Sequence, residues 1–188
     1  MQVTRRPTST TASTTSEPGA ALRILLVVAS LSGNTRELGR HIQARCQAAG
    51  HVVHWQEADD LRAAAPLAAD EADLVLLGCW TDNAGRTPSE MKAWVAGIAE
   101  RGQRPRQLAV FGTGETQWGQ EYYCGAVHRL IRYFNSSYPP LEIEQMPHGA
   151  RDAAAIDAWT DAVLAHYWRN HDADHRRHHP CAVPAAAG

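Results

Sequence analysis

The segment Ser30–Thr35, with the sequence SLSGNT, constrains the fold of this chain more than any other feature. It follows a short apolar run, Ile24 to Ala29, that is typical of a buried strand, and it precedes a helical pattern that begins at Thr35. A strand, a tight turn and a helix in this order place several backbone N–H groups around one hollow, at the positive end of the helix dipole. The segment therefore predicts a binding site for a phosphate group.

The side-chain donors of this segment are all neutral. Ser30, Ser32 and Thr35 carry hydroxyls, Asn34 carries an amide, and no Lys follows Gly33. The P-loop that binds a triphosphate with Mg²⁺ needs that lysine, so this segment does not match it. We expect a site for a single terminal phosphate, and the alternative is an ordinary serine-capped turn between a strand and a helix.

Apolar runs alternate with helical patterns along the rest of the chain. The runs predict strands at residues 23–29, 51–55, 73–78, 107–111 and 141–146. The spacing of apolar residues predicts helices at residues 35–49, from Pro88 (with Thr87 as N-cap) to the Gly102 that ends it, at 122–134 and at 153–170, with a weak one at 61–67. This alternation is typical of an α/β fold with a parallel sheet covered on both faces, whose ligands bind beyond the carboxyl ends of the strands.

The two ends of the chain differ from its middle. Residues 1–21 form a Ser/Thr-rich leader that we expect to be disordered, residues 22–170 form one folded domain, and residues 171–188 form a His-rich flexible tail. His171 and His175 are one helical turn apart and would suit a metal if the helix continued. No acidic scaffold fixes them, so we predict no metal site.

Composition excludes several classes of function. The chain has a net charge of −2, and residues 22–168 hold 13 basic and 17 acidic residues, a net charge of −4, which argues against nucleic acid as a partner. No apolar run approaches the length of a membrane span. The four cysteines form no CxxC pair, which favours a reducing cytoplasm.

Two further loops follow predicted strands at the same edge of the sheet. The loop Cys79–Thr87 contains Trp80, and the loop Gly112–Gln120 contains Trp118, with small residues and few charges around both. Aromatic side chains beside a phosphate site favour a flat aromatic ligand that binds by stacking. No nucleophile, base and acid are brought together by this order of residues, which favours a carrier whose cofactor supplies the chemistry.

These residues resemble the flavodoxins, small electron carriers that bind flavin mononucleotide (FMN). Ser30–Thr35 resembles the family's phosphate loop, (S/T)x(S/T)GNT, and the stretches Gly112–Glu115 and Glu121–Val127 resemble its segment FGxGD…E(Y/F)FCGAVD. The resemblance covers residues 23 to about 168. It implies a flavodoxin-like, doubly wound, five-stranded parallel sheet of order 2-1-3-4-5, with helices on both faces.

The resemblance also implies which residues hold FMN. The phosphate would lie on the segment SLSGNT, with a hydroxyl from Thr81, and Trp118 falls where the family has its outer stacking Tyr. Glu115, where the family usually has Asp, and Cys124 match positions that line the ring. The implied cofactor-binding residues, with no catalytic residue and no metal ligand among them, are Ser30, Leu31, Ser32, Gly33, Asn34, Thr35, Trp80, Thr81, Asp82, Asn83, Gly112, Thr113, Gly114, Glu115, Trp118, Tyr122, Tyr123 and Cys124.

Two positions depart from the family pattern. Asp82 stands where many flavodoxins have a Trp, so the inner face of the ring is left to Trp80 or to another apolar or backbone group. Asn83 stands where the family often has Gly, at a peptide that flips when the flavin is reduced, and Asn tolerates the positive φ that a flip requires. The last predicted strand lacks a long insertion, which is typical of the short-chain type.

The implied function is low-potential transfer of one electron at a time on non-covalently bound FMN, without enzymatic activity of its own. Asp82, Glu115 and Glu121 beside the flavin would disfavour its reduced, anionic form and lower its potential. The same acidic rim would steer basic redox partners to a monomeric carrier. Such partners are an NAD(P)H-dependent flavodoxin/ferredoxin reductase and an acceptor enzyme.

Three alternatives remain open at this point. One is a flavodoxin-like redox activator of ribonucleotide reductase. The stretch Gly114–Gly119 of this chain faintly resembles a loop of that group. Another is an NAD(P)H-dependent FMN quinone or azo reductase, which would need substrate-pocket insertions and usually a dimer. The third is a phosphate-binding regulatory domain, which fits poorly because Gly78-Cys79, rather than an acceptor Asp, ends the third predicted strand.

Overall fold

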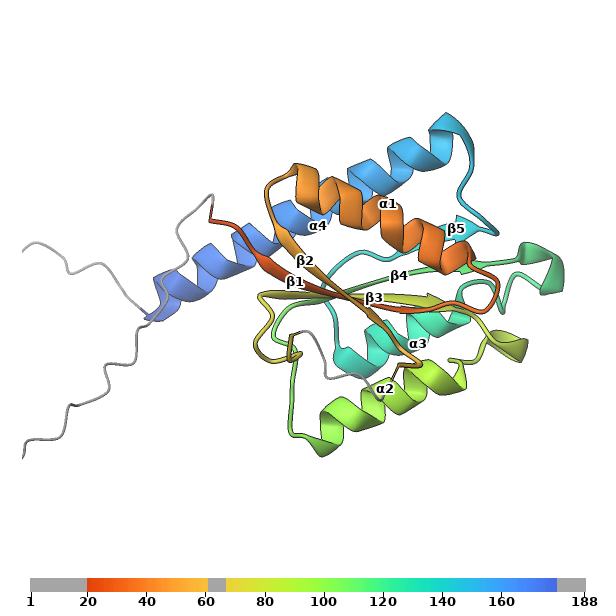
Figure 1. Cartoon of the computed structure of the whole chain (residues 1–188), viewed down its shortest axis with the longest axis horizontal. Helices are drawn as coiled ribbons and strands as arrows, with labels where there is room; N and C mark the ends of the chain where they lie inside the picture. The colour runs from red at the N-terminus through yellow and green to blue at the C-terminus, as the bar shows by residue number, and fades with distance from the viewer. Residues whose placement is uncertain (1–19, 61–66, 179–188) are drawn as a thin grey trace, which may run out of the picture.

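The computed structural model describes residues 20–60 and 67–178 (Figure 1). Strands and helices alternate along these residues, as the sequence pattern predicts. The elements are β1 (Arg23–Ala29), α1 (Asn34–Ala48), β2 (Val52–Glu57), β3 (Leu74–Trp80), the short 3₁₀ helix η1 (Asn83–Gly85), α2 (Ser89–Glu100), β4 (Leu108–Gly114), the 3₁₀ helix η2 (Thr116–Trp118), α3 (Gly125–Phe134), β5 (Leu141–Glu144) and α4 (Gly149–His178).

The five strands form one parallel sheet of order β2-β1-β3-β4-β5, which confirms the predicted fold. Helices α1 and α4 cover one face, and α2 and α3 cover the other (Figure 1). The central strands β1, β3 and β4 are buried on both faces, which explains why they read as continuous apolar runs. Strand β5 lies at an edge and alternates buried with half-buried residues.

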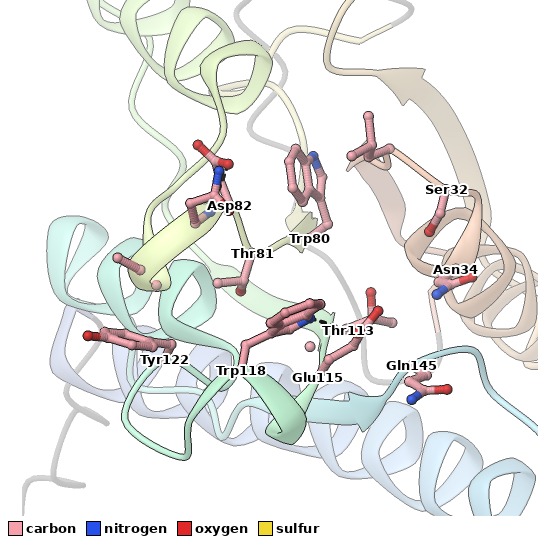
Figure 2. A pocket seen from close by; sticks show the side chains of 15 residues that line it. Ser32, Asn34, Trp80, Thr81, Asp82, Thr113, Glu115, Trp118, Tyr122 and Gln145 are labelled. Atoms are coloured by element: carbon pink, nitrogen blue, oxygen red, sulfur yellow. Dashed lines mark hydrogen bonds between the residues drawn. The ribbon is translucent and has the colours of Figure 1, made fainter.

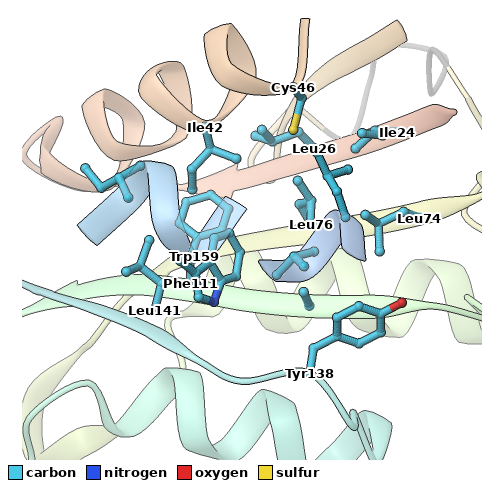
Figure 3. Packing of buried hydrophobic residues seen from close by; sticks show 14 of the residues in the cluster. Ile24, Leu26, Ile42, Cys46, Leu74, Leu76, Phe111, Tyr138, Leu141 and Trp159 are labelled. Carbon is cyan, nitrogen blue, oxygen red and sulfur yellow. The ribbon is translucent and has the colours of Figure 1, made fainter. Parts of the chain in front are cut away.

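Each face of the sheet has its own hydrophobic core. On the side of α1 and α4, Phe111 of β4 meets Trp159 of α4 edge to face, with ring centroids 6.0 Å apart (Figure 3). Leu38 and Ile42 of α1 pack into the same cluster. The indole N–H of Trp159 donates to the carbonyl oxygen of Pro139 at 2.8 Å, so this large side chain is buried without an unsatisfied donor.

Strand ends differ most from the sequence-based prediction. β3 reaches Trp80, and β4 includes Gly112–Gly114, which we expected in a loop. Both extensions follow from pairing, because Thr113 lies in register with Trp80 on one side and with Ile143 on the other. β2 is shifted toward the carboxyl end, to Val52–Glu57, where it continues to pair with β1.

The ends of several helices also differ from the predicted ones. α1 begins one residue early because Gly33, with φ of 98°, is its N-cap. Helix α2 begins at Ser89 with Pro88, not Thr87, at the N-cap, and α3 begins at Gly125, because Cys124 adopts a left-handed φ of 46° that breaks the preceding turn. β5 ends at Glu144, since Gln145 has a φ of 55°.

The last helix is longer than predicted at both ends. α4 spans Gly149–His178 rather than residues 153–170, so its last turns enter the segment expected to be a flexible tail. The predicted weak helix at residues 61–67 falls almost wholly on residues 61–66, which lie outside the described residues, as do residues 1–19 and 179–188. In the part of the chain that is described, no helix has the length and apolarity that a membrane span requires.

Candidate functional site

A pocket of about 490 Å³ opens at the carboxyl ends of β1, β3 and β4 (Figure 2). Its volume lies in the range of small-molecule and cofactor sites, and its position is the one at which ligands bind in open parallel sheets. Four chain segments meet there: the residues that follow β1, the ends of β3 and β4 with the residues after them, and Gln145 after β5. The lining residues are Leu31, Ser32, Asn34, Trp80, Thr81, Asp82, Asn83, Ala84, Gly85, Thr113, Gly114, Glu115, Trp118, Tyr122 and Gln145.

The segment SLSGNT forms the first wall. Ser32 and Asn34 line the pocket, and Gly33 turns the chain into α1 with a positive φ that suits glycine. The Ser30 hydroxyl lies outside the lining and accepts a hydrogen bond from the N–H of Arg36 at 3.2 Å, which satisfies a donor of the first helical turn. Asn34, the first residue of α1, lines the pocket, so the start of this helix lies at the pocket wall.

The segment that follows β3 is held by its own backbone. Asp82 and Arg86 exchange N–H···O hydrogen bonds at 2.9 and 3.0 Å and close the loop around η1, in which Ala84 has a φ of 55°. The Asp82 carboxylate accepts from the N–H of Asn83 at 2.7 Å and lies 3.9 Å from the Arg86 guanidinium. Asp82 is thus tied to its own loop, and offers no aromatic surface to the pocket.

This loop is docked on the start of α3. A Cβ added at Gly125 would lie 2.6 Å from the carbonyl oxygen of Gly85, so the two backbones approach more closely than a side chain permits. Arg129 donates its Nε–H to that same carbonyl at 2.8 Å, and the Thr81 hydroxyl accepts from the N–H of Ala126 at 3.3 Å. These contacts fix the distance between the loop and the helix.

Trp80 ends β3 and lines the pocket. Its indole N–H donates to the Glu90 carboxylate of α2 at 2.6 Å, which sets the orientation of the ring. Trp118 reaches the same pocket from η2 and is 71% exposed (Figure 2). The pocket therefore has one indole from the end of β3 and one from η2.

Trp118 is held by carboxylates. Its indole N–H donates to Glu115 at 2.8 Å, and the Gln117 amide contacts the same carboxylate. The Glu144 carboxylate of β5 accepts from the N–H of Thr116 at 3.0 Å, at the start of η2. The turn that carries Trp118 is thereby attached to the edge of the sheet.

Several predicted site residues are not among those that line the pocket. They are Ser30, Gly33, Thr35, Gly112, Tyr123 and Cys124. Thr35 is fully buried and its hydroxyl lies 2.8 Å from that of Thr113. Cys124 is also fully buried, and desolvation, with the nearby Glu142, raises the pKa of its thiol to about 12, so it stays protonated at neutral pH. Desolvation also raises the pKa of the Tyr123 phenol.

Sequence reasoning did not identify Ala84, Gly85 and Gln145, which the structure adds to the lining. Ala84 and Gly85 directly follow the predicted site residues Asp82 and Asn83. Their position in the same loop could therefore have indicated that they line the pocket. Gln145 follows β5, and its N–H donates to the carbonyl oxygen of Gly114 at 2.8 Å. The rule that ligands lie beyond the carboxyl ends of parallel strands could have indicated it.

The pocket is more suited to a neutral-donor phosphate site than to a metal. Among the described residues that line it there is no Lys, Arg or His, and its carboxylates are Asp82 and Glu115. Within residues 20–60 and 67–178, no group of three or more His, Cys, Asp or Glu side chains is placed to hold a metal ion.

Comparison with known proteins agrees with this geometry. Residues 26–136 match the model of the family described as flavodoxin. The chain is 31% identical over 140 residues to a protein named probable flavodoxin 2 of Bacillus subtilis (strain 168), with 72% of this chain and 90% of that protein covered. It is 26% identical over 148 residues to a flavodoxin of Nitratidesulfovibrio vulgaris, with 75% and 96% covered.

The structural comparison gives the same result for the fold. The crystal structure of oxidised flavodoxin 1 from Bacillus cereus superposes with a TM-score of 0.66 at 21% identity. The superposition covers 77% of this chain and 98% of that one. The superposed region thus includes nearly all of the Bacillus cereus flavodoxin, and the additional residues of this chain lie outside that region.

Proposed function

The chain belongs to the flavodoxin family of electron-transfer flavoproteins, and has its short-chain form; from this we propose that it carries one electron at a time, at low potential, on non-covalently bound FMN. Flavodoxins are electron carriers rather than enzymes, and the family implies a flavin cofactor.

The observation that carries the proposal is the composition of the one pocket in which the three loops meet. Ser32 and Asn34 offer neutral donors beside the start of α1, where a phosphate group is favoured. Trp80 and Trp118 offer apolar surface to a flat ring, and the volume of about 490 Å³ suits a ligand of this size. Both ends of FMN, the phosphate and the aromatic ring, thus have fitting partners.

The proposed binding residues form groups, according to the part of FMN that each group would contact. Leu31, Ser32 and Asn34, supported by Ser30, Gly33 and Thr35, would hold the phosphate, and Thr81 would add a hydroxyl near it. Trp118 would cover the outer face of the ring. Trp80 would serve the inner face, because Asp82 stands at the position where many flavodoxins have a Trp. The remaining wall would be provided by Asn83, Thr113, Gly114, Glu115 and Tyr122, and the predicted residues Gly112, Tyr123 and Cys124, which are outside the lining, would support it.

FMN, when bound, supplies the one-electron redox chemistry. The chain supplies a negative environment, because Asp82 and Glu115 line the pocket and no basic side chain does so among the described residues. Negative charges beside a group that gains electrons raise the free energy of its reduced form, so we expect a low potential. Glu121 lies outside the lining and adds to the acidic rim rather than to the wall.

The partners that we propose follow from the same charges. An acidic rim around the pocket attracts basic surfaces and favours brief, salt-sensitive docking. An NAD(P)H-dependent flavodoxin/ferredoxin reductase as electron donor and an acceptor enzyme fit this description. We expect the carrier to be a monomer in the cytoplasm.

The test is an absorption spectrum of the purified full-length protein, followed during stepwise anaerobic reduction. Flavin bands that disappear in two separate one-electron steps would support the carrier. A flavin reduced in a single two-electron step, NAD(P)H oxidation by the protein alone, or a dimer in gel filtration would favour the quinone reductase. The ribonucleotide reductase activator would be favoured by specific reduction of that enzyme system. No flavin, even after addition of excess FMN, would contradict the proposal.

A further inference from the structure

A second cavity lies between the ends of α2 and α3, which cover the same face of the sheet (Figure 1). It has a volume of about 340 Å³, and we call it the α2–α3 cleft. Its walls come from the last turns of both helices and from the segment that joins α2 to β4. The lining includes Val95, Ile98, Arg104, Pro105, Tyr133 and Phe134.

The α2–α3 cleft and the pocket described above lie at opposite ends of the same strand. Residues 102–105 precede β4 and line the cleft, whereas Thr113 and Gly114, at the carboxyl end of β4, line the pocket. The seven residues of β4, at about 3.3 Å each, separate the two sites by roughly 20 Å. A partner seated in the cleft therefore leaves the mouth of the pocket open.

The cleft presents an exposed aromatic side chain. Tyr133 is 64% exposed, and its ring meets that of Phe134 edge to face, with centroids 4.9 Å apart. Phe134 is partly buried against the core beneath α2 and α3, so it gives this side of the cleft a fixed apolar wall. Exposed apolar surface around a hollow is typical of a site that receives an apolar side chain from a partner.

The charged side chains beside the cleft are basic and lack an ionic partner. Residues 101–106, with the sequence RGQRPR, hold three Arg and no acidic residue. Arg104 lines the cleft, Arg106 directly follows Pro105 of the lining, and both are exposed. Within residues 20–60 and 67–178 neither makes an ion pair, whereas four other arginines do, namely Arg23, Arg36, Arg45 and Arg86. Two uncompensated positive charges thus stand next to an apolar hollow.

Stabilisation of helix ends does not account for these two charges. A basic side chain stabilises the C-terminal end of a helix when it lies in or next to the last turn. Arg132 has that position in α3, and Arg101 directly follows α2. Arg104 and Arg106 lie four and six residues beyond Glu100, the last residue of α2, so the helix does not require them.

We propose that the α2–α3 cleft is a docking site for an acidic segment of a partner protein, whose apolar side chain enters the cleft while its carboxylates face Arg104 and Arg106. Opposite charges across an interface determine the choice of partner and the rate of encounter. A hollow receives one inserted side chain, which favours a protein segment over the flat surface of a membrane. This inference goes beyond the proposed function, because it gives the chain a second partner surface at the end opposite the acidic rim.

The probe for this site is a short synthetic peptide in which a Leu-Phe pair is flanked by Glu on both sides. Amide chemical shifts of the full-length protein are followed by NMR as the peptide is added. We expect changes at residues 98–105 and 133–134, and none at residues 113–118 of the pocket. A peptide with Lys in place of every Glu, or with Ala in place of Leu-Phe, should bind more weakly. Added salt should weaken binding of the Glu peptide, because the arginines are exposed.

Arg104→Glu tests the role of charge. Because it replaces attraction by repulsion at an exposed site, we expect the Glu peptide to bind about 5-fold more weakly, and the Lys peptide to bind more tightly than it does to wild type. Arg151→Glu makes the same change in α4, at an exposed arginine without an ion pair among the described residues, and should leave both affinities close to those of wild type.

Tyr133→Ala tests the apolar part of the site. It should weaken binding of the Glu peptide, because the aromatic surface of the cleft is lost. Met146→Ala also removes an exposed apolar side chain, 53% exposed and outside the cleft, and should not change this affinity. Arg104→Glu and Tyr133→Ala should both bind FMN as wild type does, since neither residue lines the pocket.

Equal affinities of wild type and Arg104→Glu for the Glu peptide, or no shift changes at the cleft at millimolar peptide, would overturn the inference. Binding to vesicles that contain phosphatidylserine, without a response to the peptide, would assign these charges to a membrane surface and would also overturn it. If urea unfolding shows that Arg104→Glu does not fold, Arg106→Glu gives the same test. A protein that binds the peptide in the cleft but binds no FMN would contradict the proposed function and leave the docking site supported.

Discussion

The indole N–H of Trp118 donates a 2.8 Å hydrogen bond to the carboxylate of Glu115, so an exposed aromatic ring and an anionic side chain are held together at the mouth of the pocket. The two residues belong to one short turn, η2 and the residue before it. The pair thus joins the aromatic surface that we propose for stacking of the ligand to a negative charge that we propose lowers the potential of the ligand.

Replacing Trp118 by Ala should weaken FMN binding by about 10-fold, because stacking on an aromatic side chain contributes about 0.5–1.5 kcal/mol beyond area burial. The free energy of unfolding should be nearly unchanged, since the side chain is 71% exposed. Fluorescence titration with FMN and urea unfolding measure the two quantities. Tyr133→Ala is the control, because Tyr133 is 64% exposed on α3 and does not line the pocket. An FMN affinity equal to wild type would exclude the stacking role.

Neutralising the carboxylates of the pocket should raise the potential at which the second electron is accepted. In Asp82→Asn and Glu115→Gln, an oxygen remains to accept from the N–H of Asn83 and from the indole of Trp118, so the geometry is kept. We expect shifts of tens of millivolts from each, because a charge a few ångströms away in a solvated site contributes about 1 kcal/mol. Spectroelectrochemistry at low salt measures this. Glu100→Gln, at the far end of α2, should leave the potential unchanged, and equal shifts in all three variants would contradict the electrostatic explanation.

Gly125→Ala should separate the loop after β3 from α3. The new Cβ would lie 2.6 Å from a backbone oxygen of Gly85, which cannot move as a flexible side chain can. We expect a loss of about 1–3 kcal/mol in the free energy of unfolding, together with weaker FMN binding. Hydrogen exchange at residues 82–86 should increase.

The matched variant is Gly97→Ala, in the middle of α2, where the added Cβ would lie 3.2 Å from the end of the Arg101 side chain. This neighbour can move, and alanine favours a helix, so we expect a gain of about 0.5–1 kcal/mol. The free energy of unfolding, measured with urea, should therefore fall in Gly125→Ala and rise in Gly97→Ala. A Gly125→Ala protein as stable as wild type would show that the loop is not held by this contact.

His51 should make stability depend on pH. Partial burial lowers the pKa of its imidazole, and its Nδ1 accepts a hydrogen bond from the N–H of Leu22 at 3.3 Å, which requires that nitrogen to be unprotonated. The unfolded state therefore binds a proton more readily than the folded state. The stabilisation is fully present above the unfolded pKa of about 6.5 and is lost as the pH falls from there through the lower folded pKa.

His51→Gln should remove this part of the pH dependence between about pH 7 and pH 5. The urea midpoints of wild type and variant, measured at both pH values, give the difference. His54→Gln, in the neighbouring strand β2, controls for the same change of side chain. Equal losses of stability on acidification in wild type and His51→Gln would show that His51 does not contribute.

The order of the elements could be predicted because each depends on local sequence. The run Ile24 to Ala29 is apolar without interruption, and Leu38, Ile42 and Cys46 recur along one face of α1. Loop chemistry was also visible, since SLSGNT combines a glycine turn with neutral donors. The ends of β3 and β4 were not predictable in the same way, because Thr113 becomes a strand residue through pairing with Trp80 and Ile143, which are distant in sequence.

The sequence by itself determined the alternating strands and helices, the turn SLSGNT and the two loops that contain Trp80 and Trp118, because hydrophobic periodicity and turn chemistry act over a few residues. Only the tertiary structure decided which side chains face the pocket. The Thr35 hydroxyl lies beside that of Thr113, the Trp80 indole donates to Glu90, and Gln145, just after β5, joins the lining. Each of these placements depends on the register and packing of elements that come together only when the sheet forms, and local pattern carries no information about such contacts.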